Sequence, residues 1–369
     1  MTNEDFSTRA AAIRNEYLLK TEGLFTANKS SYFNAFKTHF CQICSQIQQM
    51  QASSTLPPIQ YLDYTMLYTN FINRIYTAEI CVYNEKSYLD KNQRIIGTYD
   101  ISYLFVYFDK LWDDLNSLKR RLVGQVSAKE ITQFMMDTLP DFYSYLVNIA
   151  RFAIAECLDQ SPLADIKKND TFMINVGDYM AKTETVYAEK KNKDANKLAE
   201  WFSEQLEKDY VFGDYSDLDF SQKSFTDTDF RYAQFRNCSL EESSLAGSSL
   251  IGANFRNANM QNCRLDYCSI YEADFTNAKL NNASFVNAYA KAGLLNDNEW
   301  KFVGFLPASF RNADLTNANF AGANLSGADF TGATLTNADF TAATVDKAIF
   351  SAGAELPLTE EQKNLAIIG

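Results

Sequence analysis

The chain has 369 residues, which is enough for about two or three domains of ordinary size. Hydrophobic residues make up 46% of the chain and charged residues 22%, a composition that is typical of folded proteins and excludes a wholly disordered chain. The net charge of −12 argues against direct nucleic-acid binding and against a basic membrane tether.

The sequence shows no targeting signal and no membrane span. Its first residues, MTNEDFSTRAAAIRNEY, lack the basic head and apolar run of a secretory signal, and charges such as Arg151 interrupt the apolar runs. The seven cysteines are odd in number and irregularly spaced, so they do not suggest a disulfide framework. We therefore expect a reduced, cytoplasmic protein that makes no membrane contact.

Residues 1–190 are expected to form a mostly helical α+β domain. Apolar residues at helical spacing predict helices in these stretches: Phe6 to Tyr17, Phe33 to Met50, Ile101 to Leu122 with Asp100 as the N-cap, and from Ser127 onward. Ser127 and Glu130 form a capping-box pattern, and Pro140 is expected to open a further helix that ends near Leu158.

Strands are expected between these helices. Residues 58–70 and 75–84 have strand-like patterns, and in the second of them Tyr76, Ala78, Ile80 and Val82 alternate with polar residues. Together they predict a β-hairpin at 58–84 that turns at Asn73–Arg74. Residues 165–190 receive no assignment, and residues 1–190 resemble no family that we recognise.

No catalytic or metal-binding constellation stands out in this domain. His39, Cys41 and Cys44 are close in sequence, but on a helix His39 points about 200° away from Cys41, and no second histidine exists to complete a zinc site. Residues 23–30 fail the phosphate-loop pattern because Asn28 replaces its second glycine, and a helix end at Ser30 explains them more simply. We predict no catalytic residue, no metal and no cofactor.

A different pattern occupies residues 213–352. Every fifth residue is large and apolar from Phe220 to Phe285 and again from Phe310 to Phe350, and the residue two positions before it is small in most repeats. A period of five fits neither a helix nor a strand. It fits a chain that turns a corner every five residues, with one large and one small side chain pointing inward from each side.

Four such sides make a coil of about twenty residues, and stacked coils would lie about 4.8 Å apart. Steps of twenty residues place Asn237, Asn257 and Asn277 in one column of corners, and Asn262 and Asn282 in another. Asparagine suits tight corners, and stacked amides can hydrogen-bond to one another.

These repeats resemble the pentapeptide repeat family, whose A(D/N)LXX motif is present as ADLTN at 313–317 and as ANLSG at 323–327. The resemblance covers about 213–352 and implies the right-handed quadrilateral β-helix of that family. Because the family is defined by its fold and not by one activity, the resemblance does not supply a function.

The repeat pauses at residues 288–307. The pause is as long as one coil, which favours a degenerate coil, whereas Trp300 and charged residues such as Lys291 favour a projecting loop, and both readings stay open. Both rod ends need covers. A helix at 193–209, within the segment 191–212, is expected to cover one end. A helix within 353–369 is expected to cover the other, with Thr359 and Gln362 as a capping box and Leu365, Ile367 and Ile368 as apolar cover.

The outward side chains of the rod are the candidates for partner binding. Arg236 stacks on Arg256, while Arg231, Ile251 and Tyr271 form a second column that Arg311 joins if the pause is one coil. The predicted partner-binding residues are Arg231, Arg236, Arg256, Tyr271, Arg311 and Trp300. Two other groups are expected to be structural: Cys238, Cys263 and Cys268 in the core, and Asp214, Asp217, Asp219, Asp227 and Asp229 at solvated corners.

These observations favour a non-catalytic binding or scaffold protein with an unknown protein partner, which could also form homo-oligomers. The first alternative is a DNA-mimicking modulator or protector of a type II topoisomerase, a role known for some pentapeptide repeat proteins. Residues 210–369 carry 19 acidic and 11 basic residues, a net charge of −8. This negative charge is much less dense than that of duplex DNA. The second alternative is an enzyme or ligand-binding activity in residues 1–190, which would require a deep pocket with perturbed carboxylates.

Overall fold

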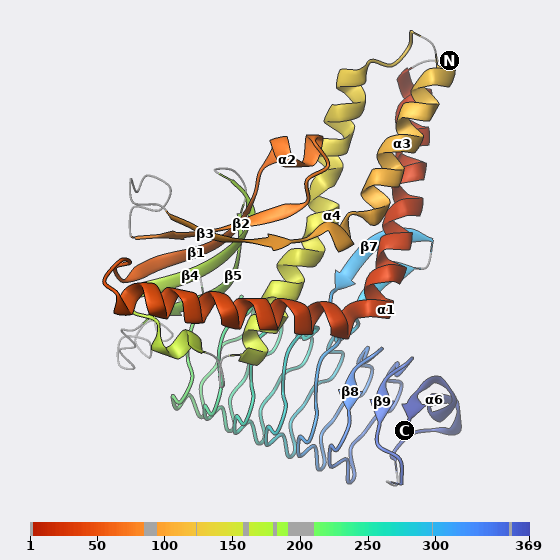
Figure 1. Ribbon diagram of the computed structural model, residues 1–369. Helices are drawn as coiled ribbons and strands as arrows, with labels where there is room; N and C mark the ends of the chain where they lie inside the picture. Colours follow the sequence, from red (N-terminus) through yellow and green to blue (C-terminus); the bar gives the residue numbers. More distant parts are fainter. Residues whose placement is uncertain are drawn as a thin grey trace. The chain divides into compact units, whose positions relative to one another are not determined.

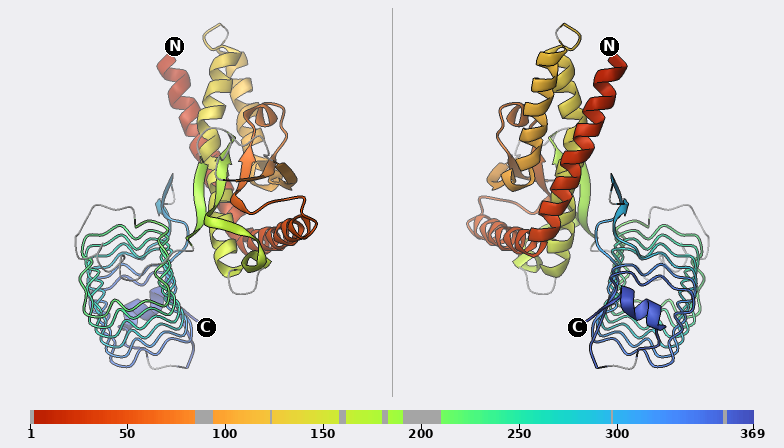
Figure 2. Two further views of the ribbon diagram at one scale, coloured as in Figure 1. Left: turned by 90° about the vertical axis from the view of Figure 1, so that its left-hand side faces the viewer. Right: turned by 90° about the vertical axis from the view of Figure 1, so that its right-hand side faces the viewer.

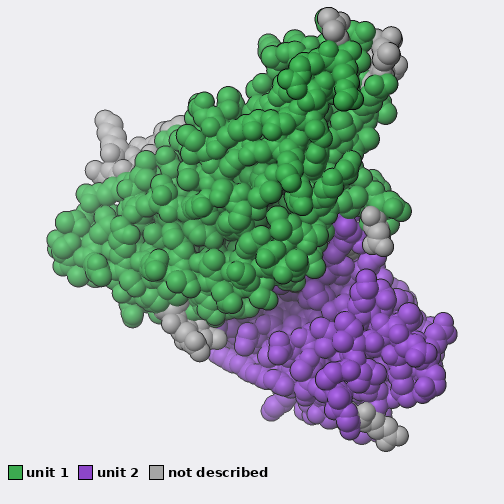
Figure 3. All heavy atoms as spheres, turned by 45° about the vertical axis from the view of Figure 1, so that its right-hand side comes forward, with its two compact units in different colours: residues 1–191, 296–300 green, residues 192–295, 301–369 purple. Residues whose placement is uncertain are grey.

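The computed structural model describes residues 3–84, 94–122, 124–157, 162–179, 183–190, 210–296, 298–353 and 356–369. The chain divides into two compact units (Figure 3). The first unit comprises Met1–Lys191 together with Asn296–Trp300, and the second comprises Asn192–Leu295 and Lys301–Gly369. The first unit combines helices with a β-sheet, and the second is a repeat β-helix. No helix among the described residues is long and apolar enough to cross a membrane.

The longest helix of the first unit, α1 (Asn3–Ala52), bends along its length (Figure 1). The two helical stripes predicted at 6–17 and 33–50 both lie on this one helix. The expected helix end at Ser30 is therefore wrong, because residues 23–30 are helical throughout. α1 packs on the sheet through Phe36, whose ring centroid lies 5.2 Å from that of Tyr64.

The second long helix, α4 (Ala128–Cys157), contains Pro140 in its interior, so the expectation that Pro140 opens a separate helix is wrong. A proline inside a helix removes one backbone hydrogen bond, but the apolar stripe continues past it and Leu139 and Phe142 are fully buried. The start of α4 is as predicted: the Ser127 N–H donates to Glu130 Oε2 at 2.7 Å, and the Glu130 N–H donates to Ser127 Oγ at 3.2 Å.

The helix α3 (Val106–Arg121) begins later than expected. Asp100 accepts a backbone hydrogen bond from the Ser102 N–H at 2.9 Å, where a short 3₁₀ turn (Ser102–Leu104) begins. Phe105 is the N-cap of α3 itself, without a side-chain capping bond. The expectation that Asp100 is the N-cap of this helix is therefore wrong, because Ile101 is the N-cap of the 3₁₀ turn and Phe105 that of α3.

The sheet of the first unit has five strands in the order β3-β2-β1-β4-β5 (Figure 1). Its strands are β1 (Ile59–Met66), β2 (Thr77–Tyr83), β3 (Arg94–Asp100), β4 (Lys168–Asp178) and β5 (Thr183–Lys190). β1 pairs antiparallel with β2 and parallel with β4. The connection between β1 and β2 contains α2 (Tyr68–Ile72), so residues 68–70 are helical where a strand was expected. Arg74, in the predicted turn, has φ +57°.

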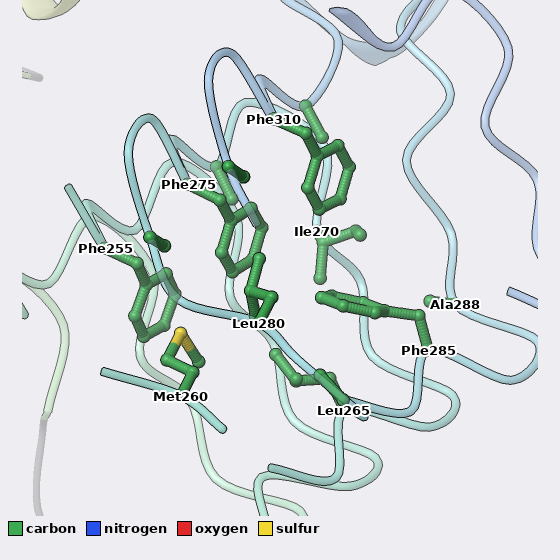
Figure 4. Close-up of a cluster of buried hydrophobic side chains, with 14 of the residues drawn as sticks. Phe255, Met260, Leu265, Ile270, Phe275, Leu280, Phe285, Ala288 and Phe310 are labelled. Atoms are coloured by element: carbon green, nitrogen blue, oxygen red, sulfur yellow. The ribbon is translucent and has the colours of Figure 1, made fainter. Parts of the chain in front are cut away.

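The second unit stacks its coils in successive layers (Figure 2). Parallel bridges join residues twenty positions apart, such as Ser239 and Asn259, which confirms the step predicted from the sequence. Both predicted inward columns are almost entirely buried, and Figure 4 shows Phe255, Leu265 and Phe275 pointing into the interior. One column is a continuous ladder of phenylalanines with centroids 4.9–5.0 Å apart, made of Phe235, Phe255, Phe275, Phe310, Phe330 and Phe350.

The interruption is a projecting β-hairpin and not a degenerate coil. Its strands are β6 (Gly293–Asn296) and β7 (Glu299–Gly304). Bridges across it join residues 35 positions apart, as in Asp274 with Ser309, instead of the usual 20, so 35 − 20 = 15 residues are inserted. The coil resumes at Leu306, whose carbonyl accepts from the Glu272 N–H at 2.9 Å.

The C-terminal end of the rod has the short helix α6 (Glu360–Leu365), and Thr359 and Gln362 form the predicted capping box. The expected apolar cover is wrong, because Leu365, Ile367 and Ile368 are 44–52% exposed. Leu358 is buried in their place. After α6, β10 (Ile367–Ile368) pairs parallel with β9 (Ile349–Phe350), which itself pairs with β8 (Asp329–Phe330). The helix predicted at 193–209 lies outside the described residues.

Candidate functional site

Three of the predicted arginines line up along the rod. The same position in four successive coils is occupied by Arg236, Arg256, Thr276 and Arg311. Backbone bonds between the coils show this alignment: the N–H groups of Asn237, Asn257 and Asn277 donate to the carbonyls of Arg256, Thr276 and Arg311, in that order, at 2.9–3.1 Å. We call these four residues the arginine column. Arg236 is half-buried and Arg311 is exposed.

The alignment of Arg311 corrects the sequence-based expectation. Had the pause been one coil of twenty residues, Arg311 would have followed Tyr271 in the column of Arg231 and Ile251. Because only fifteen residues are inserted, Leu306 takes that position and Arg311 falls one corner further on, in line with Arg256.

Aspartates from the following coil hold two of the arginines. The Nη1 atom of Arg256 lies 3.3 Å from Asp274 Oδ2, and that of Arg311 lies 3.6 Å from Asp329 Oδ2. The arginine side chains remain 38% and 57% exposed, so each pair contributes at most about 1 kcal/mol to stability. Both guanidinium groups thus have a carboxylate beside them and stay accessible to solvent.

A ladder of asparagine amides runs beside the arginine column. The Asn277 side-chain N–H donates to Asn257 Oδ1 at 3.2 Å, and the Asn257 N–H donates to Asn237 Oδ1 at 3.3 Å. All three residues have φ of 56–58°, a region that asparagine tolerates better than most residues. The backbone that carries the arginines is therefore fixed by both its own ladder bonds and the amide ladder.

Arg231 and Tyr271 lie in the column that precedes the arginine column by five residues. Arg231 is bound to Asp229 through Nε, 2.9 Å from Oδ1, and through Nη2, 2.8 Å from Oδ2. Hydrogen bonding to Asp229 raises the pKa of Arg231. Tyr271 is half-buried, and burial raises its pKa. A Cβ added at Gly304 would lie 2.3 Å from its ring, so the base of the inserted hairpin covers part of this tyrosine.

Trp300 belongs to the first unit and is not part of either column. Its indole Nε1–H donates to Tyr145 Oη at 3.0 Å, and its backbone N–H donates to Asn15 Oδ1 at 2.8 Å. Tyr145 in turn donates to Glu22 Oε2 at 2.9 Å. Burial raises the pKa of Glu22. Sequence reasoning missed these partners because they come from distant helices.

The histidine and the aspartates that the sequence offered as possible metal ligands make contacts of an ordinary structural kind. Among the described residues, no group of three histidine, cysteine or acidic side chains could hold a metal ion. His39 packs beside Tyr99 with ring centroids 4.6 Å apart, and burial lowers its pKa. In the first coils, Asp219 accepts from the Ser221 side chain and backbone, which lower its pKa, and Asp217 accepts from the Asn237 amide.

Comparison with known families identifies the class of the C-terminal region. The family model for pentapeptide repeats matches residues 216–245, 228–266 and 308–351 in eight copies. The C-terminal region is therefore a pentapeptide-repeat region, as its five-residue pattern predicted. No family model matches the N-terminal part. A comparison with curated proteins found no match.

Several solved structures are similar to the repeat region. A pentapeptide repeat protein from the thylakoid lumen of Arabidopsis thaliana is 20% identical, over 41% of this chain and 72% of its own, with a TM-score of 0.17. HetL is a pentapeptide repeat protein from Nostoc sp. strain PCC 7120 that is involved in regulating heterocyst differentiation. It is 18% identical over 45% of this chain and 100% of its own, with a TM-score of 0.14. QnrB1, a plasmid-mediated fluoroquinolone resistance protein, is 16% identical over 42% of this chain and 93% of its own, with a TM-score of 0.15. Likeness at this level carries no functional argument.

Proposed function

We propose that this protein is a non-catalytic binding or scaffold protein whose repeat rod presents the arginine column to a protein partner. The observation that carries the proposal is the alignment of Arg236, Arg256 and Arg311 in one column of the rod, with an aspartate paired with each of the last two. Side chains that are oriented before binding lose less entropy on association, which favours a binding surface.

The chemistry of the column defines the partner that it fits. Guanidinium groups present planar arrays of N–H donors that match carboxylates and carbonyl oxygens. Successive coils lie about 4.8 Å apart, so the donors repeat along the rod at a fixed spacing. Arginine and tyrosine are also enriched among residues that dominate interface energies. We therefore place the partner's acceptors along this face, with Arg231 and Tyr271 of the preceding column at its edge.

The proposal includes a finer description of the rod and of its setting. We take each coil to have four sides and a right-handed course, which the family resemblance implies and the five-residue corners support. We place the protein in a reducing compartment such as the cytoplasm, and the seven free cysteines support that setting. Participation of Trp300 in partner binding stays a prediction.

Affinity capture with the tagged full chain from cells of the source organism tests the proposal. The bait would be compared with a variant that combines Arg256→Glu and Arg311→Glu. We expect at least one captured protein whose recovery falls sharply with this variant, because charge reversal replaces attraction by repulsion at both positions.

Arg264→Glu provides a matched control. Arg264 is also paired with an aspartate, Asp266, and its side chain is 61% exposed, but it lies in a different column. Recovery of the partner should be unchanged with this variant. Equal recovery with the wild type and with the column variant would refute the proposed surface.

A further inference from the structure

Three cysteines of the first unit lie where α1 meets α4. Cys41 and Cys44 are on α1, and Cys157 is the last residue of α4. Lys37, one turn before Cys41, lies 3.7 Å from Glu156, the residue before Cys157. The two helices are thus in contact at this point, and the Cys41 thiol lies near enough to Cys157 to raise the pKa of the Cys157 thiol.

The three thiols differ in access to solvent. Cys41 is half-buried and lies on the side of α1 that also carries Lys37, Thr38 and Gln42. Cys157 and Cys44 are only 1% and 0% exposed. A small oxidant from solvent therefore meets Cys41 before either of the other two thiols.

We propose that Cys41 and Cys157 form a redox-active thiol pair that a peroxide converts to a disulfide. In the first step the Cys41 sulfur attacks the O–O bond of hydrogen peroxide, which gives a sulfenic acid and releases one water. In the second step the Cys157 thiol attacks the sulfenic sulfur, the S–S bond forms, and a second water leaves. Two thiols lose two electrons in total, and one peroxide is reduced to two waters.

The surroundings of the thiols assign the two roles. Burial raises the pKa of Cys157 to about 12, so this thiol is poorly ionised and is protected from direct oxidation. It is suited to react second, once Cys41 carries an electrophilic sulfur beside it. Burial also raises the pKa of Cys44 to about 12, and its sulfur has no access of its own.

The bond would join α1 to the C-terminal end of α4, the two longest helices of the chain. This inference concerns the first unit and is independent of the partner surface on the rod. It is compatible with a reducing setting, in which both thiols stay free until a peroxide is present.

The test is peptide mapping of the full-length protein. The native protein would be treated with equimolar hydrogen peroxide, its remaining thiols alkylated, and the chain digested with trypsin without reduction. Trypsin releases Cys157 in the peptide 152–167 and both Cys41 and Cys44 in the peptide 38–74. We expect these two peptides as one disulfide-linked species, with fragment ions that place the bond at Cys41.

Single serine variants separate the two candidate partners of Cys157. The linked species should persist in Cys44→Ser and disappear in Cys41→Ser and Cys157→Ser, and circular dichroism would check that each variant is folded. The buried Cys238, Cys263 and Cys268 of the rod serve as internal controls and should be recovered in reduced form. A bond placed at Cys44, or full alkylation of Cys41 in oxidised wild-type protein, would overturn the proposal, and both can be read without any variant.

Discussion

Phe275 and Phe310 stack face to face, with ring centroids 5.0 Å apart and ring planes 4° from parallel, although 35 residues separate them. Phe255 and Phe275, which are separated by an ordinary coil of twenty residues, stack at 5.0 Å and 2°. The inserted hairpin therefore leaves the phenylalanine ladder of the rod unchanged. The chain leaves the coil after Ala290 and re-enters it at Leu306 in the same register.

This relationship predicts that deletion of residues 291–305 preserves the rod. Joining Ala290 to Leu306 restores an unbroken five-residue pattern, so the far-UV circular dichroism of the rod and its unfolding midpoint should stay close to those of the wild type. A deletion of residues 291–303 is the control, because it removes thirteen residues and puts the inward positions out of phase. Similar losses of stability in both variants would contradict the assigned register.

The inside and outside of the rod can be tested with one charge. Leu265 is fully buried, so Leu265→Asp should destabilise the rod by several kcal/mol, on the order of what it costs to bury an unpaired polar group. Thr276→Asp places the same carboxylate on the outer face in the arginine column and should be tolerated. Thermal unfolding followed by circular dichroism would measure both, and equal shifts in the two variants would disprove the assignment.

Asp63 predicts a pH dependence in the first unit. Burial raises its pKa from 3.8 to about 6, although the Asn175 amide donates to its Oδ1 at 2.8 Å. The folded state therefore binds this proton more tightly than the unfolded state does. Stability from this group is present below about pH 4 and is lost as the pH rises through about 6.

Asp63→Asn should remove this penalty. We expect the variant to be more stable than the wild type by about 2–3 kcal/mol at pH 7.5, and to lose the stability change between pH 4 and 6. Urea unfolding across that range would measure the free energy of unfolding. Asp170→Asn, at an exposed position of the same sheet, is the control and should change little. If the first unit of the wild-type protein became more stable between pH 4 and 6, the predicted direction of the Asp63 effect would be contradicted.

The rod was predictable from the sequence because each repeat carries its own information. A large inward residue, a small one and a polar corner recur every five positions, and each coil bonds only to its neighbours. The amide ladder of Asn237, Asn257 and Asn277 could be predicted for the same reason. The position of Arg311 could not be predicted in this way. Ala290 occupies an inward position at which a large apolar residue was expected, so the interruption seemed longer than the fifteen residues that are inserted.

The first unit was less predictable because its structure depends on distant contacts. β1 pairs parallel with β4, so Leu62 lies opposite Ile174, and no local pattern announces such a partner. Burial against the rest of the unit also overrides local signals, since Pro140 and Gly23 both lie inside continuous helices. The contact of α1 with α4 at Lys37 and Glu156, and the hydrogen bond from Trp300 to Tyr145, belong to the same class and required the structure.

The topoisomerase alternative makes a separate prediction. Several rod carboxylates are already engaged: Asp229, Asp266, Asp274 and Asp329 pair with arginines, and Asp314 and Asp339 accept bonds from neighbouring residues. Such a surface lacks the dense negative charge of duplex DNA. We therefore expect no inhibition of gyrase supercoiling, and no rescue from a quinolone, at micromolar protein. A dose-dependent effect that Asp→Asn changes abolish would favour the DNA mimic instead.

The most direct test of the account is the affinity of the captured partner for the arginine column. Binding of the purified partner to the immobilised full chain would be measured for the wild type, for Arg236→Glu combined with Arg256→Glu, and for Arg264→Glu. We predict that the double variant keeps its unfolding midpoint and binds at least about tenfold more weakly, since arginine is enriched among the residues that dominate interface energies and two charges are reversed. Wild-type affinity in the folded double variant would contradict the claim that this face of the rod binds the partner.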